Sequence, residues 1–242
     1  MAYLDFDTLV VCNNDFSDPF LTDCFPFFHE LGIRNFIFTY DFDPANRSVA
    51  EGVRLFQQLK PYLHRFQPRN TRIYTAINVI LDKDVAYSQD LRRLTLPHTD
   101  RIFITLPIFT GNEWLEADLA HLVYRKRLQP LFTSFERNAI TYTDDMLERF
   151  SRLPQSVFCL DANYIFSLRA QAKLSELLRA NVRILPCISN RMSDYVALFD
   201  GYADLKKRLG LPMYRTLCKT FREASVSLRK DFTEPARHSS HP

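Results

Sequence analysis

Glycine is scarce in this sequence, and its scarcity excludes the common nucleotide-binding loops. The 242 residues include only five glycines, which stand far apart at Gly32, Gly52, Gly111, Gly201 and Gly210. Neither the G-x-G-x-x-G pattern of dinucleotide-binding folds nor the G-x-x-x-x-G-K-[ST] pattern of P-loops occurs. Both patterns need clustered glycines so that the backbone can approach a phosphate. We therefore exclude Rossmann-type and P-loop functions.

Histidine is missing from the places where metal ligands are expected, and cysteine lacks the spacing of a metal site. The five cysteines show no C-x-x-C spacing, which is typical of a reduced, cytoplasmic protein without a structural zinc site. The six histidines fall in expected helices, in a loop before a strand, or near the C-terminus, at His29, His64, His98, His121, His238 and His241. A hydrolase that used transition metals would need imidazole ligands at the carboxyl ends of its strands.

Neither charge nor hydropathy points to a nucleic-acid or membrane partner. The net charge is only +3, from 31 basic and 28 acidic residues. The densest basic run, Arg125-Lys126-Arg127, ends an expected helix, where cations suit the helix dipole. No apolar run approaches the roughly 20 residues of a membrane-spanning helix, and the first residues lack the basic and apolar regions of a secretory signal. We expect no nucleic-acid partner and no direct membrane insertion.

Apolar and aromatic residues, in contrast, are abundant. Hydrophobic types make up 46% of the chain, with 21 Phe and 11 Tyr, which is ample for a core. Seven short apolar segments favour strands, at 8–11, 35–40, 72–81, 101–107, 130–135, 156–162 and 182–188. Amphipathic segments between and after them predict helices, at 25–31, from Ser48 with an interruption near Pro61, and at 114–128, 143–153, 167–181, 193–209 and 212–230.

This alternation of strands and helices predicts the α/β class, built from parallel β/α units. The strands are apolar on both faces, as expected for a sheet covered on both sides. A closed barrel of about seven strands is our first expectation, and an open doubly wound sheet is the second. No linker-like segment interrupts the pattern, so we expect one domain over residues 1–232 and a frayed tail over 233–242.

In either architecture a ligand binds at the carboxyl ends of the strands. The candidate residues at these ends are mostly polar: Cys12, Asn13, Asn14, Asp15, Asp41, Asp43, Asn78, Thr105, Ser134, Glu136, Arg137, Asp161, Asn163, Cys187, Ser189, Asn190 and Arg191. Cys12 lacks the phosphate-binding loop of cysteine phosphatases, so we interpret it as a buried structural residue.

Four segments carry a resemblance to a known family, over about Thr8 to Lys219. They read ELGIRNFIFTYD, LVYRKRLQPLFTSFERN, VFCLDANYIFS and LLRANVRILPCISNR. Their order, their spacing and their pattern of hydrophobic residues resemble the PHP (polymerase and histidinol phosphatase) superfamily. Within it, they resemble the bacterial tyrosine phosphatases of capsular and exopolysaccharide synthesis. Pro130, Glu136 and Arg137 match the family pattern. The resemblance implies a distorted (β/α)7 TIM-like barrel and a cluster of divalent metals, and the cysteine pattern already favours a cytoplasmic location.

The metal ligands of that family do not recur here. The family's opening D-x-H-x-H motif is replaced by the stretch from Cys12 to Asp15, and the family's bridging glutamate falls at Ile77 or Asn78. The vestigial metal-site positions are Cys12, Asn14, Asp41, Asn78, Ser134, Ile188 and Asn190. We therefore expect a pseudophosphatase with no metal and no other cofactor.

Two functional hypotheses remain. The first is a pseudophosphatase with a binding or regulatory role in exopolysaccharide or capsule synthesis. Its partner would be a tyrosine-phosphorylated protein or a bacterial tyrosine kinase of polysaccharide assembly, held through Arg137 and Arg191 as phosphate-binding arginines. Both arginines could instead form ion pairs at the barrel rim. The second hypothesis is a still active phosphoric monoester hydrolase that uses Asp15, Asp41 and Glu136 with a single Mg²⁺ or Mn²⁺.

Overall fold

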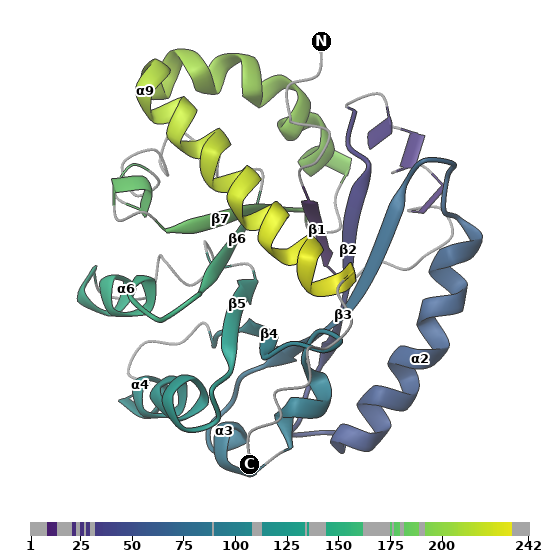
Figure 1. The fold of residues 1–242 in the computed structure, drawn as a ribbon, viewed down its shortest axis with the longest axis vertical. Coiled ribbons are helices and arrows are strands. Elements are labelled where there is room, and N and C mark those ends of the chain that lie inside the picture. The colour runs from purple at the N-terminus through teal and green to yellow at the C-terminus, as the bar shows by residue number, and fades with distance from the viewer. Residues whose placement is uncertain are drawn as a thin grey trace.

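Seven parallel strands close into a barrel in the computed structural model of the chain (Figure 1). The structure describes residues 9–13, 21–22, 25–26, 28–29, 32–88, 90–107, 113–133, 135, 144–161, 175, 177–179, 182–188 and 192–233. The strands are β1 (Leu9–Asn13), β2 (Asn35–Phe42), β3 (Arg72–Ile80), β4 (Arg101–Thr105), β5 (Gln129–Thr133), β6 (Val157–Asp161) and β7 (Arg183–Ile188).

The first strand closes the barrel by pairing on both of its edges. Strand β1 pairs with β2 over its whole length, and its Val11 and Cys12 lie opposite Cys187 and Ile188 of β7. The closed barrel is therefore confirmed, and the open doubly wound sheet is wrong. Closure also confirms that Cys12 and Cys187 lie near the ends of neighbouring strands.

Side chains that alternate along each strand form two hydrophobic clusters. The inner cluster fills the barrel and includes Val11, Ile37, Ala76, Phe103, Leu131, Cys159 and Leu185. The outer cluster lies beneath the helices and includes Phe36, Phe38, Ile73, Ile102, Ile104, Phe132, Phe158 and Ile184. Since both faces of the strands are buried, both faces are apolar, which is the pattern that predicted a covered parallel sheet.

Helix α2 (Val49–Arg65) begins as expected and ends later than expected. The Ser48 hydroxyl accepts the backbone N–H of Glu51 at 3.3 Å and caps the helix. Gly52 lies so close to Phe42 that a Cβ there would come within 2.5 Å of the ring. The interruption expected near Pro61 is wrong, because the helix continues for another turn. Leu63 lies on that turn and is buried in the outer cluster, so it packs the end of the helix against the barrel.

The connection from β3 to β4 contains two short helices that the sequence patterns did not predict, α3 (Val85–Ser88) and η1 (Leu91–Leu94). After β4, helix α4 (Glu113–Ala120) continues into the π-helical segment η2 (His121–Arg125). The helix expected over 114–128 therefore ends at Arg125, and the left-handed Arg127 (φ 56°) leads into β5. Helix α6 (Asp144–Ser151) lies within the expected range.

The last helical segment, α9 (Met192–Thr233), is two helices joined at Gly210. Gly210 has φ 74° and ψ 157°, a backbone conformation that ends one helix and lets Pro212 start the next. The break separates the two helices expected at 193–209 and 212–230. Figure 1 shows the second helix crossing in front of the strands. None of the helices in the described ranges is both long and apolar enough to cross a bilayer.

The second helix of α9 closes the barrel at the amino ends of the strands, which we call the floor. Ala224 and Leu228 belong to the inner cluster, and Phe232 stacks on Tyr74 with ring centroids 4.4 Å apart. The Arg101 guanidinium, at the start of β4, donates to the Ser227 hydroxyl at 2.6 Å. This helix therefore covers the amino ends of the strands.

Candidate functional site at the barrel mouth

The carboxyl ends of the strands, which we call the mouth, carry polar side chains in place of the apolar ones below them. Thr39 and Asp41 come from β2, Asn78 from β3, Thr105 from β4 and Thr133 from β5. Thr39, Asn78 and Thr133 are fully buried, whereas Asp41 and Thr105 are partly exposed. Buried polar groups need hydrogen-bond partners. Asp41, Asn78, Thr105 and Thr133 are partners of one another, whereas the Thr39 hydroxyl donates to the Cys12 carbonyl.

Asn78 is the centre of this hydrogen-bonded network. Its Nδ2 donates to Asp41 Oδ1 at 2.5 Å and to Thr105 Oγ1 at 2.8 Å. Its Oδ1 accepts from Thr133 Oγ1 at 2.9 Å, and the two threonine hydroxyls lie 2.6 Å apart. Both ends of the amide are therefore used, and one side chain links four strands.

Strand register explains why these residues meet. Asp41 lies opposite Asn78, and Thr105 lies opposite Thr133. Alternation points Asn78 into the barrel and its neighbour Ile77 outward, into the outer cluster. Of the two positions that the family's bridging glutamate could match, only Asn78 therefore faces the mouth.

Other candidate residues are placed differently or are not described. Cys12 points into the outer cluster and is 2% exposed, while its carbonyl accepts the Thr39 hydroxyl at 3.4 Å. Cys187 lies in the inner cluster. Asp43 lies just beyond β2, where its carboxylate accepts the backbone N–H of Ala45. Asn13, Asp161 and Ile188 end their strands, but their side chains are not described. Outside the described residues lie Asn14, Asp15, Ser134, Glu136, Arg137, Asn163, Ser189, Asn190 and Arg191.

Thr39 and Thr133 are site residues that the sequence analysis missed. Each lies two residues from a residue whose inward orientation alternation predicts, Asp41 for Thr39 and Leu131 for Thr133. This two-residue spacing was the signal from which both threonines could have been predicted to face the barrel interior. Threonine is also a common strand residue, so its hydroxyl did not stand out as polar.

The polar groups that the structure describes at the mouth do not fit as ligands for a cluster of divalent metals. One carboxylate, one amide and three hydroxyls are present, and the amide already uses both of its polar ends. Divalent cations in hydrolytic sites are held mainly by carboxylates and imidazoles. Within the described part of the chain, no three His, Cys, Asp or Glu side chains gather at one point.

Comparisons with known proteins connect this barrel to solved structures. No protein-family model matches the sequence, and no curated protein matches it. A solved structure does match, from work on YwqE of Bacillus subtilis and CpsB of Streptococcus pneumoniae, described as unique metal-dependent tyrosine phosphatases. It is 19% identical, with a TM-score of 0.56, over 80% of this chain and 82% of that one. The likeness shows the fold. It confirms the distorted (β/α)7 barrel that the PHP resemblance implies.

A second buried polar group lies away from the mouth, on α4. Asp118 is 2% exposed, and its Oδ2 has no hydrogen-bond partner among the described residues. Burial raises the pKa of the Asp118 carboxyl above its ordinary 3.8, and the negative charge of Asp84 adds to this. The backbone N–H of Asp84 and the charges of His121 and Lys83 act in the opposite direction. At neutral pH an ionised Asp118 therefore weakens the fold.

Asp118→Asn is expected to stabilise the protein at pH 7 by about 1 kcal/mol, because it removes a charge that burial disfavours. The folded carboxyl binds its proton more tightly than the unfolded one, so the Asp118 contribution is most favourable in acid. That contribution is lost as the pH rises from 3.8 through the folded pKa. Urea unfolding of both proteins between pH 4 and 8 measures the difference.

Exposed Asp82, whose carboxylate accepts the backbone N–H of Lys83 at 2.7 Å, gives the matched control. Asp82→Asn keeps this acceptor and should change stability by less than about 0.5 kcal/mol at every pH. An Asp118→Asn variant whose stability follows the wild-type pH profile would contradict the burial argument.

Proposed function

We propose that this chain is a degenerate homologue of the PHP-type tyrosine phosphatases, without phosphatase activity, that binds or regulates a partner in exopolysaccharide or capsule synthesis. The observation that carries the proposal is the state of Asn78. A neutral amide occupies the inward position on β3, and Asp41, Thr105 and Thr133 already use its polar atoms.

Metal-dependent phosphate hydrolysis needs ligands that hold the cation and lower the pKa of its bound water. To bind Asn78 Oδ1, a cation at this mouth would have to displace the Thr133 hydroxyl, and Asn78 would offer it only an uncharged oxygen ligand. To bind Asp41 Oδ1, it would have to displace the Asn78 amide. The vestigial positions Asn14, Ser134 and Asn190 offer weaker ligands than histidine or aspartate, and the Ile188 side chain offers none. This chemistry supports binding in preference to catalysis.

We further propose Arg137 and Arg191 as the groups that bind a phosphate at the mouth. In the sequence, Arg137 follows β5 and Arg191 follows β7. Arginine can hold phosphate with two parallel hydrogen bonds. The partner would be a tyrosine-phosphorylated protein or a bacterial tyrosine kinase of polysaccharide assembly, in the cytoplasm.

The purified protein is expected not to hydrolyse phosphotyrosine peptide or p-nitrophenyl phosphate above background, with Mn²⁺, Co²⁺ or Mg²⁺ supplied. The same preparation should bind the phosphotyrosine peptide, followed by NMR, and the double change Arg137→Ala plus Arg191→Ala should abolish this binding. Turnover that disappears in Asp41→Asn or Glu136→Ala would overturn the pseudophosphatase proposal. Binding that is equal in wild type and double variant would overturn the arginine assignment.

One observation favours a second candidate function. The Asp41 carboxyl group, which has the oxygen atoms that a hard cation prefers, is partly exposed at the mouth. Together with Asp15 and Glu136 it could hold a single Mg²⁺ or Mn²⁺ in an active phosphoric monoester hydrolase. Elemental analysis of the purified protein separates the two functions, since the hydrolase requires about one bound ion per chain and the pseudophosphatase requires none.

A further inference from the structure

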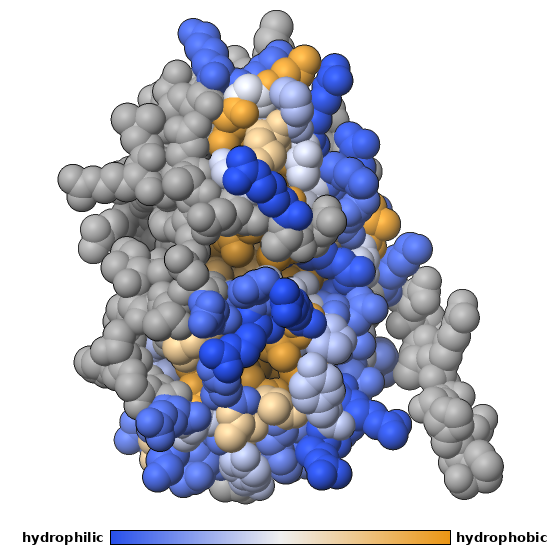
Figure 2. Space-filling model, turned by 90° about the vertical axis from the view of Figure 1, so that its left-hand side faces the viewer, coloured by the Kyte–Doolittle hydropathy of each residue, from blue (hydrophilic) through white to orange (hydrophobic). Residues whose placement is uncertain are grey.

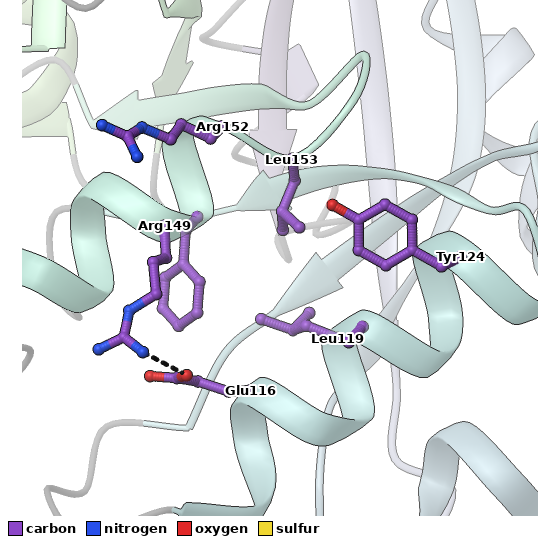
Figure 3. Close-up of a pocket in the computed structure, with 8 residues that line it drawn as sticks. Glu116, Leu119, Tyr124, Arg149, Arg152 and Leu153 are labelled. Atoms are coloured by element: carbon purple, nitrogen blue, oxygen red, sulfur yellow. Dashed lines mark hydrogen bonds and ion pairs between the residues drawn. The ribbon is translucent and has the colours of Figure 1, made fainter.

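A groove of about 290 Å³ lies outside the barrel, between α4–η2 on one side and α6 on the other (Figure 3). Its apolar lining comes from Leu119 and Ala120 on one wall and from Phe150 and Leu153 on the other. Leu119 and Phe150 are buried core residues, and the Phe150 ring packs on Phe132 of β5 with centroids 6.4 Å apart. The groove floor is therefore continuous with the outer cluster and has a fixed shape.

Tyr124 forms an exposed aromatic wall of this groove. Its ring extends from η2 toward Leu153, as Figure 3 shows. It is 62% exposed, more than the other large hydrophobic residues found exposed in the described part of the chain. A tyrosine in this position offers a broad apolar face and a hydroxyl at little cost in conformational entropy, which is why tyrosine is enriched at binding interfaces.

The rim of the groove is charged, with an excess of arginine. Arg149 pairs with Glu116 at 2.9 Å across the groove, and Arg152 pairs with Glu148 at 2.5 Å. Both arginine side chains are more than half exposed, at 60% and 75%, so these pairs are weak and can exchange partners. Figure 2 shows this face of the molecule, with apolar surface framed by hydrophilic side chains.

The charged side chains that line the groove are Arg149, Arg152 and Glu116, which leaves a net charge of +1 on the lining. A positive rim around an apolar floor complements an acidic chain with an apolar anchor. The volume is at the lower limit of small-molecule sites, roughly 300–1,000 Å³. It suits one anchoring side chain better than a cofactor.

We propose that the groove between α4–η2 and α6 is a docking site for an acidic peptide segment of a partner protein. One aromatic or aliphatic side chain of the peptide enters between Tyr124 and Leu153, over Leu119 and Phe150. Acidic residues on either side of that anchor pair with Arg149 and Arg152. This site is separate from the barrel mouth and does not depend on the function proposed for the mouth.

Fluorescence anisotropy with a labelled nonapeptide tests the site, using a peptide of aspartate and glutamate around a central phenylalanine. Wild-type protein is expected to bind it, and to bind more weakly as salt is raised. Tyr124→Ala should weaken binding about 5–10-fold, because it removes the aromatic wall of the groove. Arg152→Gln should weaken binding about 3–5-fold, because it removes one exposed charge. A peptide with alanine at its centre should bind at least about 5-fold more weakly.

Matched controls come from the exposed surface of α9, where Leu211 and Arg215 lie. Leu211→Ala and Arg215→Gln should leave affinity unchanged, and all four variants should keep the wild-type melting temperature because each changes an exposed side chain. No binding by wild type at about 1 mM peptide, or equal binding by all variants, would overturn the proposal. A dimer in sedimentation that Tyr124→Ala dissociates would also overturn it, by assigning the groove to a second copy of the chain.

Discussion

Leu228→Ala is expected to destabilise the protein by about 2–5 kcal/mol, the range for removing a buried leucine from a packed core. Leu228 lies near the end of α9, yet it is 0% exposed and belongs to the inner cluster of the barrel. Its loss leaves a cavity at the floor, among side chains that several strands hold in place. The strands cannot move inward to fill that space without breaking their hydrogen bonds.

Val226→Ala, two residues earlier on the same helix, is the control. Val226 is 38% exposed and points away from the floor. Its replacement should change the free energy of unfolding by less than about 0.5 kcal/mol. Urea denaturation followed by circular dichroism measures both variants. If Leu228→Ala is no more destabilising than Val226→Ala, the helix covers the barrel loosely and is not part of its core.

The sequence predicts the strands of this barrel well because each is buried on both faces. Segments such as 35–40 and 182–188 are mostly apolar and rich in β-branched or aromatic residues, and the structure has β2 and β7 there. Gly210 and Pro212 also predict the break in α9 correctly. The floor is different, because the pattern of an amphipathic helix shows that one face is buried without showing against which surface. Only the folded chain places Leu228 beneath the strands.

At the mouth, strand ends identify Asp41, Asn78 and Thr105 from sequence alone, because the carboxyl ends of parallel strands share one side of a barrel. The hydrogen bonds among them depend on how far neighbouring strands are shifted along one another, which the sequence does not reveal. Thr105 lies opposite Ile80 in the register and still reaches Asn78, two residues earlier on β3. Cys12 shows the same limitation, since a shift of one residue decides whether a side chain faces the mouth or the helices.

Asn78→Asp is expected to destabilise the protein by about 3 kcal/mol at pH 7.5, because it replaces a buried hydrogen-bond donor by a second carboxylate. Nδ2 of Asn78 now donates to Asp41 Oδ1 at 2.5 Å. Two carboxylates at that distance cannot both ionise, so one pKa of the pair rises above its unfolded value. The folded variant then binds an extra proton, and its stability should recover as the pH falls toward the acid range.

The same chemical change can be made at an exposed site, where Asn46 Nδ2 donates to Asp43 Oδ2 at the same 2.5 Å. Asn46 is exposed, so water screens the two carboxylates in Asn46→Asp, and its loss should stay within about 0.5 kcal/mol with little pH dependence. Thermal unfolding of both variants from pH 5 to 8 compares the buried and the exposed pair directly. Equal losses, or an Asn78→Asp variant as stable as wild type at pH 7.5, would mean that the mouth is open to water. The hydrogen-bonded network of Asn78 would then no longer argue against a metal site.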